Sequence, residues 1–384
     1  MSHYSWREGL PAPKLLPERA FMKIKSIFKW ILIGFAALVV VVAAWAWLTT
    51  YHPADVESVK FECSDKAPVL KPGQKVKVLS WNVQYMAGKN YVFFYDLIDN
   101  SGPDERPSSA DITTTINEVA RVIKSENPDV ILLQELDEGA KKTDYENQLK
   151  RLLSLLPADY SCHASAFYWK ASYVPHPRIR GSVGLKLAVI SRFKVTSSTR
   201  YQLELIPGDP VTMLFNFRRA VLELRMPVDG GGEFAFLTTH LDAFAQGTNT
   251  MEKQASQVKE ILDTLSAKKV PWVIGGDFNL LPPGGMYEAL PGDQRAYFNP
   301  KTEIEPLFKA YKSVPSLAEA NGPEVKKWFT HYPNDPAVKA PDRIIDYLFF
   351  SNSVTMGAHY VRQNDTLKIS DHLPVVAEFA IPGN

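Results

Sequence analysis

Residues 30–48 are the feature that most constrains this chain. These 19 consecutive positions carry no charged residue, and a helix of about 20 apolar residues is what the hydrocarbon core of a bilayer requires. The run has one glycine and no proline, so no residue in it breaks a helix. A soluble helix normally keeps a polar face, which argues against a buried helix of a globular domain. The run therefore predicts a single transmembrane helix.

The flanking charges predict its orientation. Six Lys or Arg and two Asp or Glu precede the run, whereas Asp55 and Glu57 come before the first cation that follows it, Lys60. Positive residues stay on the cytoplasmic side. We therefore expect residues 1–29 to form a cytoplasmic tail, and the chain beyond the run to be extracytoplasmic (periplasmic if the protein is bacterial).

A cleaved signal peptide is the competing interpretation. Residues 44–46 (Ala-Trp-Ala) fit a small-x-small cleavage pattern, and Met22 begins a basic segment of the kind that opens a signal peptide. The apolar run is long for a signal peptide, which favours an uncleaved anchor.

Beyond the run, composition predicts a linker and one domain. Residues 49–75 contain proline and charge without a regular pattern, whereas apolar and amphipathic segments alternate through residues 76–384. Residues 1–48 contain six basic and two acidic residues, so the rest of the chain carries 37 basic against 40 acidic residues. Nonspecific nucleic-acid binding depends on neutralising phosphates, so this balance makes nucleic acid the less favoured partner.

The chain has two cysteines, Cys63 and Cys162. Outside the cytosol, two cysteines in one domain can form a disulfide, but their separation leaves pairing and two isolated thiols both open. A zinc site of four thiolates is excluded.

The segments after residue 75 predict a mixed α/β domain built in layers. Apolar residues recur at helical spacing in residues 110–126, 145–156 and 252–265. Strands are predicted for residues 75–83, 130–135, 185–191, 220–226, 233–241, 272–274, 344–350 and 375–381.

Several of these strands end at a polar residue, where a rigid sheet presents side chains to a pocket. Cleavage of a phosphoester needs charge neutralisation, for which Mg²⁺ held by one or two carboxylates is suited. Glu135 and Asp371 are carboxylates at such positions. Asp277 can accept the proton of a water, and Asn279, two residues on, can donate to a phosphate oxygen.

Histidines complete the candidate set. His372 offers an imidazole whose pKa suits proton transfer near neutrality, and Asp346 is placed to orient it from a neighbouring strand. His240 ends another strand and can donate to a phosphoryl group in the transition state.

The order of these residues resembles that of the endonuclease/exonuclease/phosphatase superfamily, over residues 76 to about 381. The motifs are WNV at 81–83, LQE at 133–135, THL at 239–241, GDFN at 276–279, IDY at 345–347 and SDHLP at 370–374. The resemblance implies a four-layered α/β sandwich, in which two packed β-sheets are flanked by helices. It also implies a metal-dependent phosphodiesterase or phosphatase that uses Mg²⁺, with Mn²⁺ as a possible substitute.

The resemblance also implies the metal ligands. Glu135 resembles the principal ligand, Asn82 lies nearby and binds metal or phosphate, and Asp371 resembles a further ligand. The number of metal ions and the oligomeric state are left open. One position departs from the abasic-site nucleases of the superfamily, which carry an acid two residues after the motif Asn. Gln84 stands there, which weakens the nuclease interpretation specifically.

The catalytic roles follow from the same resemblance. Asp277 resembles the residue that orients or deprotonates the attacking water, and Asn279 and His240 resemble the groups that hold the scissile phosphate. His372 resembles the general base or transition-state stabiliser, with Asp346 behind it.

The substrate is predicted from the anchor, the acidic balance and the aromatic residues 90–98. That run is either a core segment or an apolar lip beside the active site, and the second interpretation favours a lipid or lipid-like head group, as in a sphingomyelinase. An extracytoplasmic nuclease is the alternative, with phosphates tracked by Arg178, Arg180, Arg218 and Arg219. An inactive interaction module is disfavoured because every key polar residue is present.

The sequence leaves the roles of two further residues open. Asp242 either supports the imidazole of His240 or caps its strand, and His331 was not assigned to the site.

Overall fold

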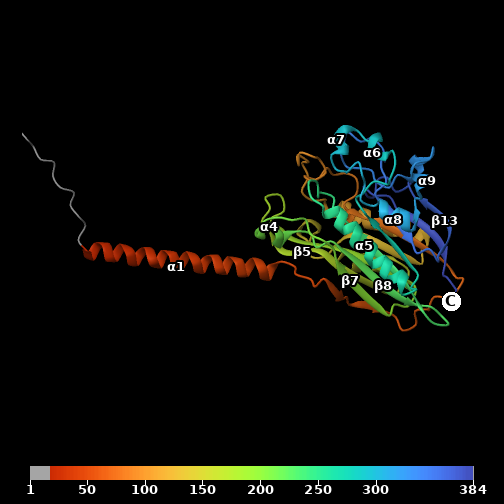
Figure 1. Ribbon diagram of the computed structural model, residues 1–384, viewed down its shortest axis with the longest axis horizontal. Helices are drawn as coiled ribbons and strands as arrows, with labels where there is room; N and C mark the ends of the chain where they lie inside the picture. Colours follow the sequence, from red (N-terminus) through yellow and green to blue (C-terminus); the bar gives the residue numbers. More distant parts are fainter. Residues whose placement is uncertain (1–17, 384) are drawn as a thin grey trace, which may run out of the picture. The chain divides into compact units, whose positions relative to one another are not determined.

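The computed structural model describes residues 18–383, which form two compact units divided between Thr49 and Thr50. The first unit contains one helix, α1 (Glu18–Thr49), shown in Figure 1. Its part Lys25–Thr49 is long and apolar enough to cross a membrane, which no other helix among the described residues is. A signal sequence has the same properties, so both interpretations of residues 30–48 remain.

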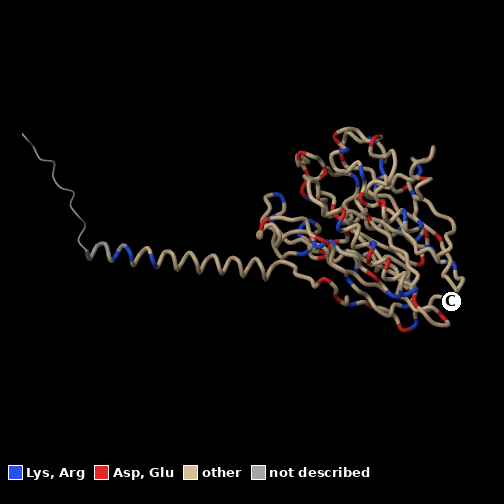
Figure 2. The backbone as a smooth tube through the Cα atoms, viewed as in Figure 1, with Lys and Arg blue, Asp and Glu red and all other residues tan. Residues whose placement is uncertain are grey.

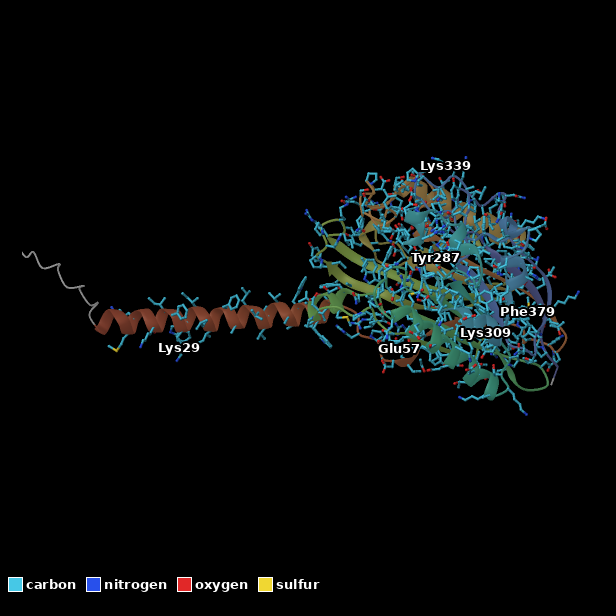
Figure 3. All side chains as sticks on the ribbon, turned by 45° about the horizontal axis from the view of Figure 1, so that its top comes forward. Lys29, Glu57, Tyr287, Lys309, Lys339 and Phe379 are labelled. Atoms are coloured by element: carbon cyan, nitrogen blue, oxygen red, sulfur yellow. A yellow bond between two sulfur atoms is a disulfide. The ribbon has the colours of Figure 1, made fainter. Side chains whose placement is uncertain are left out.

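The helix is longer than the predicted span and takes in residues 18–29 of the predicted tail, whereas residues 1–17 lie outside the described residues. Its large apolar side chains are exposed, among them Trp30, Phe35 and Leu48, and they project from the helix beyond Lys29 in Figure 3. A helix that is apolar all round is suited to lipid rather than to water.

The second unit, called the main unit here (Thr50–Asn384), contains two sheets of seven strands each. Sheet A has the order β13 (Thr355–Val361), β14 (Val375–Ala380), β3 (Lys75–Asn82), β4 (Val130–Asp137), β6 (Gly181–Ser191), β5 (Cys162–Val174) and β2 (Phe61–Cys63). Sheet B has the order β1 (Val56–Ser58), β7 (Ser197–Gln202), β8 (Ala220–Pro227), β9 (Glu233–His240), β10 (Trp272–Asp277), β12 (Asp346–Phe350) and β11 (Lys312–Val314).

The two sheets pack face to face, with helices on both outer faces. A core that includes Val78, Leu132, Leu222 and Phe236 lies between the sheets. The outer face of sheet A packs against α2 (Ser109–Glu126) and α3 (Gln148–Leu155). The outer face of sheet B packs against α5 (Thr250–Ala267) and α8 (Glu305–Ala310), both labelled in Figure 1. The four-layered α/β sandwich is confirmed.

Short helices occupy the connections. They are α4 (Pro210–Phe215), α6 (Met286–Ala289), α7 (Gly292–Arg295), α9 (Leu317–Ala320) and the 3₁₀ turns η1 (Gln84–Met86), η2 (Lys141–Thr143) and η3 (Val325–Trp328).

Helix α2 shows how local sequence sets these elements. Ser108 caps it by accepting a hydrogen bond from the backbone N–H of Asp111, and Asn127 ends it in the left-handed conformation. Ile116 and Ile123 are among the apolar residues that it buries against sheet A at helical spacing.

The eight predicted strands and three predicted helices are all present, with boundaries shifted by a few residues. The linker prediction for residues 49–75 is corrected, because this segment contains β1 and β2. Strand β1 pairs with β7 and β2 with β5, so the segment joins both sheets. Such short edge strands lack the length that makes an alternating pattern visible in a sequence.

Cys63 and Cys162 form a disulfide, which settles the pairing that the sequence left open. The two residues are direct partners in the antiparallel pairing of β2 and β5, so the bond fastens the edge of sheet A. In the main unit, basic and acidic residues are interspersed along the backbone rather than gathered by sign (Figure 2).

Strand direction gathers the polar strand ends at one edge of the sandwich. Strands β3 and β4 are parallel, as are β9 and β10. Strands β3, β9 and β10 end at Asn82, His240 and Asp277, and β4 carries Glu135 two residues before its end. Strands β12 and β14 run antiparallel to their neighbours and begin at the same edge. The two sheets therefore meet there with one half of the predicted set each.

Gly275 in β10 lets the sheets approach closely next to this edge. A Cβ there would lie 2.7 Å from Leu348, 2.8 Å from Leu132 and 2.9 Å from Ser80. Since Leu132 and Ser80 belong to sheet A, the glycine accommodates the opposite sheet, and the sequence offered no means to distinguish this role from contact with substrate.

Candidate active site

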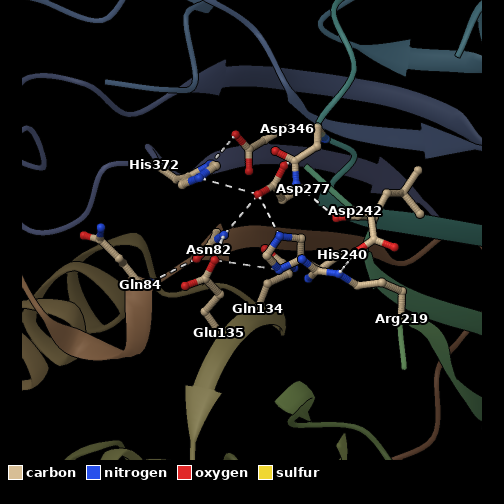
Figure 4. A network of polar contacts seen from close by, with 12 residues as sticks. Asn82, Gln84, Gln134, Glu135, Arg219, His240, Asp242, Asp277, Asp346 and His372 are labelled. Carbon is tan, nitrogen blue, oxygen red and sulfur yellow. Dashed lines mark hydrogen bonds and ion pairs between the residues drawn. The ribbon is translucent and has the colours of Figure 1, made fainter. Parts of the chain in front are cut away.

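Asn82 links the two sheets at the centre of the site (Figure 4). Its Nδ2 donates to Glu135 Oε1 at 3.0 Å and to Asp277 Oδ2 at 3.1 Å, and its Oδ1 accepts the backbone N–H of Gln84 at 3.0 Å. One buried amide therefore holds a carboxylate of sheet A and a carboxylate of sheet B in fixed relation.

Glu135 is turned into the site by an irregularity in β4. Its φ is +60°, and the pairing of β4 with β6 shifts register between Leu133 and Leu136. A bulge of this kind re-aims a side chain at the expense of regular pairing. Burial, and next the nearby charge of Asp371, raise the pKa of Glu135, so the site favours a cation beside this carboxylate.

Gln84 holds Asp371, the carboxylate predicted as a further metal ligand. Its Nε2 donates to Asp371 Oδ2 at 2.9 Å. Gln84 and the next two residues, Tyr85 and Met86, all have positive φ, a costly backbone that fixes the turn after β3. The position at which this chain departs from abasic-site nucleases is thus occupied by an amide that orients an acid.

His372 lies between two carboxylates of sheet B. Its Nδ1 is 2.8 Å from Asp346 Oδ2, and its Nε2 is 3.5 Å from Asp277 Oδ2. Burial alone would lower the pKa of His372, but the charges of Asp346, Asp277 and Asp371 together raise it well above its usual value. Burial, partly opposed by His372, also raises the pKa of Asp277. The three carboxylates therefore stabilise the protonated imidazole of His372.

His240 faces the same carboxylates from β9. Its Nε2 lies 3.3 Å from Asp277 Oδ2 and its Nδ1 lies 3.8 Å from Glu135 Oε1. Burial, followed by the charges of Arg219 and His372, lowers the pKa of His240 well below its usual value. The imidazole is therefore neutral near pH 7.

Asn279 has a φ of +51° just after β10. Its backbone N–H donates to Asp277 Oδ1 at 3.0 Å, and its Nδ2 donates to the carbonyl of Leu241 at 3.0 Å. The structure therefore brings all eight predicted site residues to one edge of the sandwich.

A cavity of about 480 Å³ opens at this edge. Six of the eight predicted residues line it, and Asn82 and Asp346 lie behind them. The rest of its wall is largely apolar and aromatic and includes Phe94, Tyr95, Tyr168, Trp169, Ile179, Val183, Leu185, Phe217 and Phe244. Basic residues also line it, namely Arg106, Lys141, Lys142, Arg178, Arg219 and Arg343. In the aromatic run at residues 90–98, Phe93 is buried in the core, whereas Phe94 and Tyr95 line the cavity.

Several polar residues of the cavity were not predicted from the sequence. Asp96 and Lys142 line it, and neither belongs to a motif or ends a predicted strand. His331, which was not assigned, also lines it, with its ring centroid 4.5 Å from that of His372. Asp242 accepts from Arg219 Nε at 2.9 Å, so it supports an arginine of the cavity wall.

The donor set fits a hard divalent cation. Glu135 and Asp371 are carboxylates with a single amide donor each from Asn82 and Gln84, and they act on each other electrostatically. Buried carboxylates in excess of basic partners favour a bound cation. Two further groups among the described residues bring three ligand atoms within 4.8 Å of one another: His331, Asp371 and His372, and Asp277, Asp346 and His372.

A sequence model of the endonuclease/exonuclease/phosphatase family matches residues 79–372, which include every predicted site residue. The chain belongs to this family. Because members of the endonuclease/exonuclease/phosphatase family are phosphoester hydrolases, the protein is a phosphoester hydrolase.

Solved structures of this family share the fold. An endonuclease/exonuclease/phosphatase from Beutenbergia cavernae is 21% identical, with a TM-score of 0.51 over 81% of this chain and 72% of that one. The catalytic domain of human Nocturnin, solved with a bound sulfate, is 17% identical, with a TM-score of 0.50 over 84% of this chain and 96% of that one. No curated protein sequence matches the chain.

Asp96 gives a testable pH dependence of stability. Burial, and next the charge of Asp371, raise the pKa of Asp96 from 3.8 to about 7. Between these values the unfolded chain releases the proton while the folded protein keeps it, so the free energy of unfolding falls as the pH rises from about 4 to about 7. The full shift corresponds to about 4 kcal/mol.

Asp96→Asn is expected to remove this loss, which urea denaturation at pH 5 and pH 8 in EDTA would measure. Asp99→Asn, at an exposed neighbouring position, serves as the control. Equal pH slopes in wild type and Asp96→Asn would show that Asp96 titrates normally.

Proposed function

We propose that the protein is a membrane-anchored, Mg²⁺-dependent hydrolase of a phosphodiester or phosphomonoester that carries a lipid or lipid-like group. The observation that carries the proposal is the cavity, which is lined by the predicted site residues and, over much of its wall, by aromatic and aliphatic side chains. Apolar pockets with a few placed polar groups bind ligands that are themselves mostly apolar.

The start of the main unit supports a lipid substrate. Thr50 pairs with Ala171 in β5, and the Tyr51 ring lies 6.2 Å from Phe167 of the same strand. Strand β5 also supplies Tyr168 and Trp169 to the cavity wall. The residue that follows α1 in the chain is therefore fixed to the strand that forms part of the cavity. With α1 as an uncleaved anchor, the main unit would be extracytoplasmic, where a disulfide such as Cys63–Cys162 persists.

Metal binding is assigned to Glu135 and Asp371, with Asn82 beside them and Gln84 orienting Asp371. Mg²⁺, or Mn²⁺ in its place, would supply neutralisation of the charge on the phosphoryl oxygens. Asn82 holds the carboxylates of Glu135 and Asp277 in a fixed position relative to each other.

Proton transfer is assigned to Asp277 and His372. Asp277 Oδ2 accepts the proton of the attacking water, because its raised pKa suits proton transfer near neutrality. His372 shares its proton with this carboxylate, and Asp346 fixes the imidazole through Nδ1. His240 and Asn279 border the same space and position the scissile phosphate.

Three of the four arginines predicted for the nuclease alternative have protein partners, and the fourth, Arg180, is exposed. Arg178 pairs with Glu105 at 3.0 Å and Arg219 with Asp242 at 2.9 Å, while Arg218 donates to the carbonyl of Met213 at 3.1 Å. Arginines used in this way do not form a row of free charges along a nucleic-acid backbone.

A substrate panel tests the proposal. The detergent-solubilised full chain is assayed with Mg²⁺ or EDTA on phospholipid vesicles, inositol phosphates and nucleic acids. We expect Mg²⁺-dependent hydrolysis of a lipid phosphoester at a rate at least about ten-fold above that of nucleic acid, a difference of about 1.4 kcal/mol. Rapid degradation of DNA with no turnover of any lipid or inositol phosphate would overturn the proposed substrate class.

A further inference from the structure

Five buried polar atoms of residues that line the cavity have no hydrogen-bond partner among the described residues. Three of them are Nδ1 of His240, Nδ1 of His331 and Nε of Arg178, of which the last is ion-paired with Glu105. The other two are donors without any such partner: Nη1 of Arg219 and the hydroxyl of Tyr168. Arg219 is 4% exposed and Tyr168 is 0% exposed. Leaving a buried donor unpaired costs about 1–3 kcal/mol, so such groups in a folded protein require an explanation.

The neighbours of the Arg219 guanidinium fix its position and leave Nη1 without a hydrogen-bond acceptor. Its Nε donates to Asp242 Oδ1 at 2.9 Å, and Asp242 is fixed in turn by Gln254 of α5, whose Nε2 donates to Asp242 Oδ2 at 2.8 Å. The guanidinium carbon lies 4.4 Å from the Phe217 ring centroid and 5.0 Å from that of Tyr168. Aromatic rings and a carboxylate thus fix its plane, while Nη1 remains available.

Arg219 and Tyr168 lie next to the predicted site residues. The Tyr168 ring packs edge-on against His240 with 5.4 Å between centroids. Burial and then the charge of Glu135 raise the pKa of the Tyr168 hydroxyl well above its usual value, so it remains a neutral O–H donor. Arg219 is a donor only, and both groups therefore call for an acceptor beside Glu135 and His240.

We propose that Arg219 Nη1 and the Tyr168 hydroxyl form an anion subsite that binds a non-bridging oxygen of the substrate's phosphoryl group. The subsite rests on the proposed phosphoester hydrolysis, and it needs no lipid. A phosphoryl oxygen accepts from both donors at once, and charge-assisted bonds from a guanidinium are among the stronger ones. The wall that holds the apolar part of the substrate thereby also holds its phosphate.

Binding of inorganic phosphate tests the subsite without turnover. Calorimetric titration of the full chain in detergent, with Mg²⁺ and with EDTA, is compared for wild type, Tyr168→Phe and Arg219→Lys. Lysine keeps the positive charge beside Asp242 but has no atom equivalent to Nη1. Each variant is expected to weaken phosphate binding about ten-fold or more.

Stability separates this role from a structural one. Tyr168→Phe removes a hydroxyl without a partner, so its Tm should stay the same or rise. Tyr347→Phe is the matched control, because the Tyr347 hydroxyl donates to the carbonyl of Leu280 at 2.8 Å. Its Tm should fall with phosphate affinity unchanged. Arg121→Lys, at an ion pair on α2 with Glu118, controls for the arginine.

Two results would overturn the subsite: no phosphate binding by wild type in either condition, or wild-type affinity in both Tyr168→Phe and Arg219→Lys. Neither depends on which substrates the panel turns over. A panel without lipid hydrolysis, combined with weakened phosphate binding by these variants, would leave the subsite and remove the proposed lipid.

Discussion

Glu135→Gln should lower turnover by about a thousand-fold or more while the folded protein becomes no less stable. A bound metal contributes several kcal/mol of transition-state stabilisation, and each factor of ten in rate corresponds to about 1.4 kcal/mol. The glutamine oxygen can still accept from Asn82, which now donates to Glu135 at 3.0 Å. In the absence of metal the change also removes repulsion between Glu135 and Asp371.

The measurements are kcat/KM on the best substrate of the panel, Mg²⁺ affinity by calorimetry and Tm in EDTA. Glu118→Gln, on the exposed side of α2, is the control. It should leave kcat/KM and Mg²⁺ affinity within about two-fold of wild type, and the free energy of unfolding within about 0.5 kcal/mol. Unchanged turnover in Glu135→Gln would remove this residue from the metal site, and a large fall in Tm would indicate that its role is structural.

Loss of the disulfide should have the largest effect on stability. Cys63 and Cys162 are 99 residues apart, and closing a loop of about 100 residues restricts the unfolded chain by about 4.7 kcal/mol in the chain-entropy estimate. The loop contains β3 and β4, which carry Asn82 and Glu135. Cys63→Ser with Cys162→Ser should therefore lower the free energy of unfolding by about 4–5 kcal/mol.

Urea unfolding of the double variant, compared with wild type with and without dithiothreitol, measures this difference. The reductant should lower the midpoint of wild type and leave that of the double variant unchanged. Identical midpoints for all samples would show that the cysteines are not joined in the protein as isolated. The pairing also bears on compartment, because a disulfide of this kind is rare in the cytosol.

The sequence was sufficient for residues whose chemistry coincides with a strand end. Asn82, Glu135, His240 and Asp277 follow apolar runs, and the direction of each strand brings them to one edge. The layers were predictable for the same reason, since buried strands and one-sided helices are visible as patterns.

The sequence was insufficient where a role depends on a distant partner. Arg219 resembles any surface arginine until Asp242 and Tyr168 are placed beside it. Gln84 was interpreted only as a missing acid, although its amide orients Asp371. Strand β5 was missed despite its 13 residues, because small and polar residues dilute its alternation of buried and half-buried positions.

The close contact at Gly275 makes the chemistry dependent on the interior of the sandwich. Glu135 belongs to one sheet and Asp277 to the other, and Gly275 leaves room for Leu132 and Ser80 of the opposite sheet. The distance between the carboxylate proposed to hold the metal and the one proposed to activate water thus depends on how the core between the sheets is packed.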